Sequence, residues 1–448
     1  MKLGKLSLVA VMALGTSAFA IDNVKVNGEA KLWYQTSEYA GQAAGVATAA
    51  NPASDLQSNQ KFFNKTNNSS ADVKLSVGAT ADLLQNLSAG VKMTALTTLG
   101  LENNLVGATP AAKYDNAGTA GGASALNDQS WVEEAYLAYT AGKTTAKVGR
   151  QALNTPLAFT ETWNVVENTF EAAVLLNNDV PDTTLVGAWV GKHNGVGLLQ
   201  PTAGRGTTVA QNGTFSTFGV SGAYAAGAIN KSIPNTTAQA WYYNVPDIAT
   251  AYWLQADTKI IDMITLGVQY AGMNPDSSSN TLTTAMGTAE RKDTNVVAVK
   301  AGVDVVGVNL YAAYSTVSKG TIGFANVATG DKSSVYTTLG SIYFDGEIAA
   351  APDTKAWKTG ASTKLVPGVA LAASYGQSKR GDNGGLTAPV VGASTANCDF
   401  SAWDVTANTK AGPVDLTAIY TQFKKDVQNT DVGDKTTDTF RVIASLKF

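Results

Sequence analysis

Histidine and cysteine are nearly absent from this chain. Its 448 residues contain one histidine, His193, and one cysteine, Cys398. A Ser-His or Cys-His nucleophile would have to use His193, and no disulfide can form within the chain. The sequence also lacks a Gly-x-Ser-x-Gly elbow, a metal-spaced His/Cys set and a phosphate-binding loop. We therefore expect no enzyme, and we interpret His193 in "GKHNG" and Cys398 in "ANCDF" as loop residues.

Long apolar runs are missing as well. No stretch reaches the roughly 20 apolar residues that a membrane helix needs, and hydrophobic content is 44% with a mean hydropathy of -0.03. These values exclude a helical membrane protein. The formal charge is -3, from 32 Lys+Arg against 35 Asp+Glu. This balance gives no electrostatic reason to bind nucleic acid.

The first twenty residues, "MKLGKLSLVAVMALGTSAFA", have the form of a secretory signal. Lys2 and Lys5 precede an apolar stretch from Leu6 to Leu14, and Ala18-Phe19-Ala20 follows. That order matches the basic, apolar and cleavage regions of a signal peptide, and the apolar stretch is too short for an anchor. We expect a signal over 1–20 and a mature chain over 21–448 outside the cytoplasm. Loss of the two lysines leaves 30 basic against 35 acidic residues, or -5.

The chain does contain a repeated segment with alternating apolar residues. It recurs as "LSAGVKM", "ITLGVQY", "VNLYAAY", "VALAASY" and "VDLTAIY", which start at Leu87, Ile264, Val308, Val369 and Val414. Successive side chains of a strand point to opposite faces, so each segment predicts a strand with one apolar face. In four segments the seventh residue is tyrosine: Tyr270, Tyr314, Tyr375 and Tyr420.

The connections between these segments alternate in length. Each segment follows a tight turn such as "LVPG" or "KAGP", and several precede long polar stretches. Short turns on one side and long loops on the other are typical of an outer-membrane barrel, with periplasmic turns and extracellular loops. The alternative is a soluble β-sandwich, which also alternates. The number of strands and the one-sided long loops favour an all-β, transmembrane antiparallel barrel.

The pattern predicts 18 strands, with a barrel of 16 as the alternative, since bacterial barrels have an even number. We place "SSVYTTLGSIYFDG" from Ser333 in a long loop because it would make the count odd. The predicted strands are 21–36, Ala71–Thr80, Leu87–Thr98, Ser130–Thr140, Lys143–Gln151, Thr169–Asn178, Thr183–Lys192, Thr214–Ala226, Thr236–Val245, Thr250–Lys259, Met263–Met273, Thr294–Asp304, Val306–Val317, Thr354–Leu365, Val369–Ser378, Phe400–Thr409, Val414–Lys424 and Thr437–Phe448.

The last of these, "DTFRVIASLKF", is interpreted as the closing strand. A barrel in lipid cannot leave an open edge, so its last strand must pair with its first. Every second residue from Phe440 to Phe448 is apolar, and this set is expected to face lipid. Arg441 and Lys447 belong to the other set of alternate residues, which is expected to face the lumen.

Alternation along the strands also assigns two sets of residues. The seventh-position tyrosines lie roughly 15 Å above the turns, at the outer edge of the apolar band. With Phe448 they form the predicted lipid-interface girdle: Tyr270, Tyr314, Tyr375, Tyr420 and Phe448. The predicted pore-lining residues are Lys92, Glu134, Tyr136, Lys147, Asp415, Arg441 and Lys447.

One loop, near 152–168, differs in composition from the Gly/Ser/Thr-rich others. It carries Trp163, Glu161 and Glu167 together with Pro156 and Phe159. An apolar-aromatic loop packs against something, and in a wide barrel the available place is the lumen. Folded inward, it would narrow the pore and place charges there, which is how pores select ions. The alternative is a surface loop packed on neighbouring loops or on a trimer partner.

Arg150 stands just before this loop and is the fourth predicted constriction residue, with Glu161, Glu167 and Trp163. Its parity is that of Ala146 and Val148, the presumed lipid face. Its place in the constriction therefore requires a bulge that resets the register; otherwise Arg150 lies above the membrane.

At this point the chain resembles a known family. "VGRQALNTPLAF" followed by "TFEAAVLL", and "LVPGVALAASYGQS" later, resemble the OprD-type porins. The whole chain, from its signal to the terminal Phe, resembles more closely the major outer-membrane porins of Campylobacter-type bacteria. The resemblance implies an 18-stranded barrel, a homotrimer and diffusion through a pore narrowed by the inward loop. It also implies that a calcium ion can bind as a cofactor, although no residues here can be matched to calcium ligands. We expect that no cofactor is required.

The resemblance also implies the partners. These are the lipid and lipopolysaccharide of a Gram-negative outer membrane, small ions and solutes, and the barrel-assembly machinery, which reads the terminal aromatic residue. The sequence departs from the amino-acid-specific OprD porins in having few arginines on the lumen parity of its strands. Uptake of specific carboxylates is therefore not expected.

We interpret the chain as an outer-membrane porin for passive diffusion of small hydrophilic solutes and ions. The charge of -5 suggests a mild preference for cations, with Glu161 and Glu167 as its source. The alternative is an occluded barrel that serves as a surface adhesin or receptor scaffold. The long loops Ser37–Ser70 and Asn274–Asp293 would suit that role equally well.

Overall fold

The structure is a computed structural model of the 448-residue chain. It describes residues 22–40, 61–63, 69–97, 128–195, 209–219, 221–279, 282, 290–340, 348–383, 397–427 and 435–448. The predicted signal over 1–20 and parts of the long loops lie outside these residues. The described residues contain no helix long and apolar enough to span a membrane.

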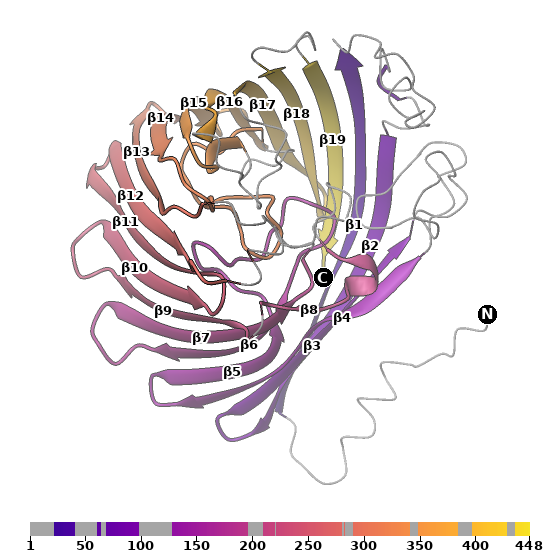
Figure 1. The fold of residues 1–448 in the computed structure, drawn as a ribbon. Coiled ribbons are helices and arrows are strands. Elements are labelled where there is room, and N and C mark those ends of the chain that lie inside the picture. Colours follow the sequence, from indigo (N-terminus) through magenta and orange to yellow (C-terminus); the bar gives the residue numbers. More distant parts are fainter. Residues whose placement is uncertain are drawn as a thin grey trace, which may run out of the picture.

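A single antiparallel sheet closes on itself. Strands that follow one another in the chain are hydrogen-bonded neighbours, and the last strand, β19, pairs with the first, β1 (Figure 1). The sheet has 19 strands, but the two-residue β8 pairs only with the end of β7, while β7 and β9 continue the wall. The wall therefore has 18 strands, and the predicted barrel and its strand number are confirmed.

The described strands and one short 3-10 turn are β1 (Asp22–Ala40), β2 (Ser69–Leu84), β3 (Leu87–Thr97), β4 (Gln129–Ala141), β5 (Thr144–Gln151), β6 (Phe170–Asn177), β7 (Thr183–His193), η3 (Gln211–Gly213), β8 (Ser216–Thr217), β9 (Ala223–Asn230), β10 (Thr236–Val245), β11 (Ala249–Ile261), β12 (Ile264–Pro275), β13 (Thr294–Val305), β14 (Val308–Val317), β15 (Thr354–Thr363), β16 (Val369–Arg380), β17 (Cys398–Ala411), β18 (Val414–Val427) and β19 (Lys435–Lys447).

The predicted strands each overlap one wall strand, with one large boundary error. The predicted strand Thr214–Ala226 spans β8 and only the start of β9. Gly219 and Gly222 have positive φ values of 61° and 80°, so the extended run breaks between the two elements. The segment from Ser333 lies in the connection between β14 and β15, and its described part, 333–340, contains no strand.

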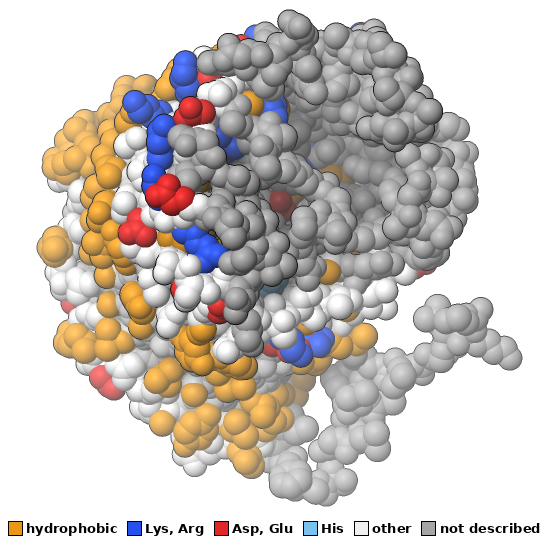
Figure 2. Space-filling model, in the orientation of Figure 1, with side chains coloured by type: hydrophobic (Ala, Val, Ile, Leu, Met, Phe, Trp, Pro, Cys, Tyr) orange, Lys and Arg blue, Asp and Glu red, His pale blue; other side chains and the backbone are white. Residues whose placement is uncertain are grey.

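Side chains alternate between the two faces of the wall as the sequence pattern predicts. On β12, Val268 and Tyr270 are exposed on the outer face, while Gln269 between them is buried toward the lumen. Figure 2 shows hydrophobic side chains spread over much of the outer wall in view. The four predicted girdle tyrosines lie on this outer face. Further outward aromatic residues join them: Trp189, Tyr224, Tyr242, Tyr252, Trp357 and Trp403.

Phe448 lies where the barrel closes. Its N–H donates to the carbonyl of Gly28 at 3.1 Å, and the Gly28 N–H donates to the carbonyl of Phe448 at 2.7 Å. The aromatic ring covers Gly28 so closely that a Cβ there would overlap it. Glycine at position 28 therefore gives the terminal ring its place against the first strand.

We predict that deletion of Phe448 lowers the yield of closed barrel more than it changes single-channel conductance. The deletion removes two backbone hydrogen bonds and the ring contact with Gly28 at the seam between β19 and β1. Heat-modifiable gel mobility measures closure, and planar bilayers measure conductance. Lys447→Gln, a change in the adjacent side chain that leaves the seam backbone intact, serves as the control. Normal yield of the deleted chain would contradict this role.

Candidate functional site: the constricted lumen

Two connections fold into the space enclosed by the wall. The first, 152–169, joins β5 to β6, and the second, 318–353, joins β14 to β15 and is described up to residue 340 and from 348 (Figure 1). We call them the constriction segment and the second inward segment. The sequence pointed to the first through its aromatic composition. It identified the second only as part of a long loop.

The two inward segments pack on each other and on the wall through apolar side chains. Leu157 of the constriction segment and Phe324 of the second segment are buried in one cluster with Trp241 and Trp253 of β10 and β11. Main-chain contacts join the segments directly, since the Val327 N–H donates to the carbonyl of Leu157 at 2.9 Å. Apolar burial thus holds both segments against one side of the barrel.

Glu161 locks the constriction segment to the second inward segment. Its carboxylate accepts hydrogen bonds from Asn326 Nδ2 at 2.9 Å, from the Lys332 N–H at 3.1 Å and from the Thr329 hydroxyl. Trp163 Nε1 donates to the same carboxylate at 2.6 Å, and Glu161 is only 2% exposed. A carboxylate with this many donors fixes the loops and presents little charge to passing ions.

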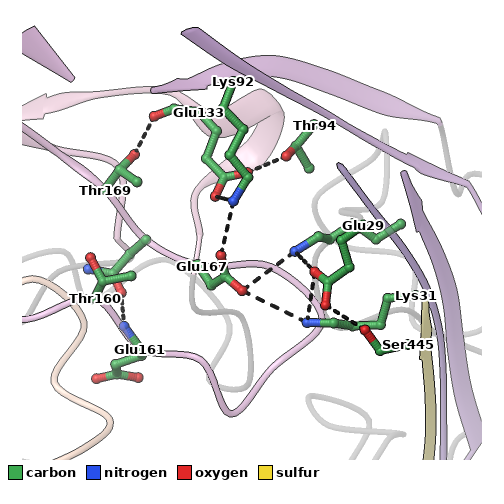
Figure 3. Close-up of polar contacts among 12 residues, drawn as sticks. Glu29, Lys31, Lys92, Thr94, Glu133, Thr160, Glu161, Glu167, Thr169 and Ser445 are labelled. Atoms are coloured by element: carbon green, nitrogen blue, oxygen red, sulfur yellow. Dashed lines mark hydrogen bonds and ion pairs between the residues drawn. The ribbon is translucent and has the colours of Figure 1, made fainter. Parts of the chain in front are cut away.

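Glu167 ties the constriction segment to the opposite part of the wall (Figure 3). Its carboxylate lies 3.5 Å from Lys74 Nζ, 3.3 Å from Lys92 Nζ and 3.9 Å from Lys31 Nζ, on β2, β3 and β1. Burial alone would raise the pKa of Glu167, but the attraction of these lysines outweighs it and the pKa is lowered. Glu167 therefore stays charged and anchors the segment.

Two further carboxylates balance the three lysines. Glu29 on β1 lies 2.8 Å from Lys74 Nζ and 3.5 Å from Lys31 Nζ, and Glu133 on β4 lies 2.8 Å from Lys92 Nζ. The cluster thus holds three cations and two anions on β1 to β4, and a third anion, Glu167, on the constriction segment. Lys74 is completely buried, a state that a lysine tolerates only when it is paired in this way.

A bulge in β4 brings Glu133 into this cluster. The register with β3 shifts here, with Lys92 opposite Glu134 and Met93 opposite Val132, so Glu133 is the extra residue. Glu133 and Glu134 are adjacent in sequence, yet both face the lumen. Strict alternation predicted Glu134 and missed Glu133, because a bulge cannot be recognised from alternation alone.

Arg441 of β19 holds the tip of the constriction segment. Nη1 donates to the carbonyl of Trp163 at 2.9 Å, while Nε and Nη2 donate to Gln35 Oε1 at 3.1 and 2.6 Å. The guanidinium lies 4.5 Å from the Trp33 ring centroid and 5.5 Å from that of Trp163. Lys332 lies 4.9 Å from the Trp163 ring as well, so this indole is flanked by two cations.

The structure places Arg150 away from these residues. The register between β4, β5 and β6 continues without a shift at Arg150. The bulge that would have turned Arg150 toward the constriction is therefore absent. Arg150 therefore keeps the parity of the exposed Val148 and lies on the outer face. Of the four predicted constriction residues, Glu161, Trp163 and Glu167 lie in the constriction segment and Arg150 does not.

The predicted pore-lining residues all lie on the lumen parity of their strands: Lys92, Glu134, Tyr136, Lys147, Asp415, Arg441 and Lys447. Lys147 Nζ lies 3.6 Å from the centroid of the Tyr136 ring. Arg441 is nearly buried by the tip of the constriction segment, so its role there is to hold that tip.

A second group of lumen charges was not identified from the sequence. On β11 and β13, Asp257 and Lys300 form an ion pair at 2.6 Å, and the Tyr336 hydroxyl of the second inward segment donates to Asp257 at 2.8 Å. Lys358 Nζ on β15 donates to the carbonyl of Thr338 at 2.7 Å. Parity would have placed the strand residues in the lumen, but no sequence signal placed the second inward segment beside them.

The structure corrects the interpretation of His193 and Cys398 as loop residues. His193 is the last residue of β7, is buried, and packs edge-on against Phe218 with centroids 5.3 Å apart. Cys398 is the first residue of β17 and is buried in an apolar cluster with Phe400. The local sequence is polar at both positions, but the inward segments and neighbouring strands cover them.

Among the described residues, no group of three or more His, Cys, Asp or Glu side chains could hold a metal ion.

A closed antiparallel barrel of 18 strands, with an apolar outer face and a polar lumen narrowed by inward segments, defines the outer-membrane porin class. The comparison with protein families agrees. The model of the Campylobacter major outer membrane protein family matches residues 1–446, and the chain belongs to that family. The family and the fold indicate a channel.

Solved structures show the same fold at low sequence identity. Pseudomonas aeruginosa OccK8 (OprE) has a TM-score of 0.68 at 13% identity, over 96% of this chain and 99% of that one. P. aeruginosa OccK9 (OpdG) has a TM-score of 0.66 at 12% identity, covering 95% and 99% of the two chains. P. aeruginosa OpdK, solved with vanillate, has 0.65 at 12%, covering 96% and 100%. No curated protein matches the sequence.

We predict that Glu161→Gln destabilises the constriction without removing the channel. A neutral amide weakens charge-assisted hydrogen bonds worth about 1.5–3 kcal/mol each, so the two inward segments should separate more often. Single-channel recordings should show more frequent transitions between conductance levels. Glu134→Gln makes the same chemical change in the lumen without linking the two segments, and it should leave the recordings steady. Equal noise in both variants would contradict the role of Glu161.

We also predict that Arg441→Lys loosens the tip of the constriction segment. Lysine keeps the charge but cannot contact Trp163 and Gln35 at once or lie flat against the two indoles. Mean conductance should therefore rise. Lys447→Arg is the matched control, because Lys447 lies on the same face of β19 and, within the part of the chain that the structure describes, makes no hydrogen bond or ion pair with the constriction segment. Unchanged conductance in Arg441→Lys would show that the tip is held without the guanidinium.

Proposed function

We propose that this porin allows small hydrophilic solutes and ions to cross the outer membrane by passive diffusion. The observation that carries the proposal is the set of charged lumen side chains that remain partly exposed to solvent. The side chains of Lys300 and Asp257 are 37% and 30% exposed, and Glu134 and Lys147 are also only partly buried. Charges in an occluded barrel would be enclosed and paired throughout, whereas these face a space that water can fill.

The proposed preference for cations is mild. It is supported by the net charge of -5 after signal removal and by the exposure of Glu134. Glu161 and Glu167, which the sequence suggested as its source, are engaged with hydrogen-bond donors and lysines. Their charges are therefore largely balanced within the protein, and they contribute less to selectivity than to the position of the constriction.

We also propose that the functional unit is a homotrimer and that the barrel-assembly machinery inserts it. The family resemblance supports the trimer. The tight seam between β1 and β19 at Phe448 supports a role of the last strand in assembly, because closure completes only when that strand pairs.

The decisive experiment is conductance in planar bilayers. We expect purified protein to insert with conductance steps in multiples of three, as three parallel pores of one trimer would give. Complete absence of conductance would reject the porin proposal and favour the occluded surface scaffold. A protein that conducts in single steps would keep the pore and reject the trimer.

Selectivity is tested by the reversal potential in a salt gradient. The wild-type potential should have the sign of a cation preference. Glu134→Gln should reduce it, because this carboxylate is partly exposed in the lumen. Glu161→Gln should change it little, because Glu161 is buried among donors. The reverse order of effects would place the selective charge at Glu161.

A further inference from the structure

Three charged side chains stand in a row on the outer face of the wall. Arg150 lies opposite Glu171, and Glu171 lies opposite Lys192, on the adjacent strands β5, β6 and β7 (Figure 1). Gln151 and Phe170, the strand neighbours of Arg150 and Glu171, are buried toward the lumen, so alternation turns these two side chains outward. On β7 a register shift with Gly191 as the extra residue turns Lys192 outward as well. We call these three residues the outer charged row.

The outer charged row lies at the level of the aromatic girdle. Arg150 is the seventh residue of β5 counted from its short turn, as Tyr270 is of β12. Trp189 lies close by on β7, opposite Ala173. In the other direction the register runs from Arg150 through Ala135, Val91 and Ala79, and it contains no aromatic residue. Where most of the wall presents aromatic rings to the membrane interface, this sector presents charge.

The Arg150 guanidinium is held in place with one edge free. Nε donates to Glu171 Oε1 at 3.0 Å, Nη1 donates to the carbonyl of Val132 at 3.1 Å, and the Phe215 ring centroid lies 4.3 Å from the guanidinium carbon. Nη2 has no hydrogen-bond partner among the residues that the structure describes. A cation fixed in this way loses little freedom when it binds an anion.

An outward-facing groove of about 590 Å³ adjoins this free edge. It contains the row itself and the hydroxyl-bearing Thr217 and Ser221, and Trp189 forms one side. Lys192, with its side chain 46% exposed, pairs with Glu171 at 3.3 Å. The groove therefore holds two cations and one carboxylate, for a net charge of +1. Glycines complete its lining: Gly149, Gly191 and Gly222.

We propose that this groove binds a phosphate group of a glycolipid headgroup in the outer leaflet. Arg150 Nη2 and Lys192 Nζ supply the donors, and the partly exposed Trp189 ring, which lies over Gly191 and Gly222, offers a flat face to a sugar ring. The level of the girdle places the groove at headgroup depth on the extracellular side. Contact with a second copy of this chain is the alternative that the test below distinguishes. The inference depends on residence in the outer membrane and is independent of solute passage.

The test compares binding of bisphosphorylated lipid A and its dephosphorylated form to the full-length protein in detergent by native mass spectrometry. Two charge-assisted contacts predict a preference of roughly tenfold or more for the phosphorylated lipid in the wild type. The double variant Arg150→Gln/Lys192→Gln should lose this preference. Lys379→Gln removes another outward-facing, ion-paired cation, 3.7 Å from Asp399, and should retain it.

Glu171→Gln gives a change in the opposite direction. It frees both cations from their shared carboxylate, so affinity for phosphorylated lipid A should increase. This variant tests the proposal even if the double variant fails to form a closed barrel, as judged by heat-modifiable gel mobility. Equal wild-type affinity for the two lipids would overturn the proposal, as would full binding by a folded double variant. Displacement of the lipid by millimolar inorganic phosphate alone would make free phosphate the ligand. Unchanged lipid binding with loss of the oligomer in the double variant would make the row a contact between copies.

Discussion

In hydrocarbon, an unpaired backbone N–H or C=O group costs several kcal/mol, on the order of a lost hydrogen bond without compensation by water. A sheet that crosses a membrane must therefore close. Here closure is made by the ladder between β1 and β19, which runs from Glu29 opposite Lys447 to Ala40 opposite Thr436. The alternating apolar outer face, the polar lumen and the fixed register of each strand depend on that closure, since an open sheet would have two edges in lipid.

Closure creates a wide lumen, and in the described part of the chain the constriction segment and the second inward segment extend into it. On one side apolar side chains such as Leu157 and Phe324 bury the segments against β10–β12. On the other side the constriction segment is held both by apolar contacts, with Val165 and Val166 buried against Trp33, Leu96 and Trp131, and by charge. There Glu167 is held by three lysines, and Arg441 donates to the Trp163 carbonyl. Glu161 joins the two segments. The constriction is thus a preorganised part of the barrel, and its acidic residues serve its position more than its charge.

The outer surface is less uniform than an apolar band with an aromatic edge. Over most strands aromatic residues meet at one level, with Tyr375 and Trp403 rings 4.6 Å apart as one example. Over β5 and β6, where the strands lead into the constriction segment, the same level carries Arg150 and Glu171, and Lys192 lies opposite Glu171 on β7, just beyond Trp189. The short strands there bring polar residues to the interface, which gives that sector a different contact with the membrane.

The sequence by itself determined the barrel, because an apolar period of two, short turns and long polar loops are local properties. They do not depend on which residues of neighbouring strands pair with each other. It favoured 18 wall strands over the alternative of 16, and it predicted the face of residues such as Lys147, Asp415 and Tyr314. It also drew attention to the loop that carries Trp163, through its aromatic composition.

Only the tertiary structure decided what depends on contacts between distant segments. The bulge that turns both Glu133 and Glu134 inward arises from pairing with β3, and alternation along β4 cannot reveal it. Glu161 is a structural anchor because the second inward segment, about 165 residues away, supplies its donors. Arg150 faces outward because its register with β4 and β6 continues without a shift. Periodicity determines on which face of the sheet a side chain lies, and tertiary packing determines which residues it contacts there.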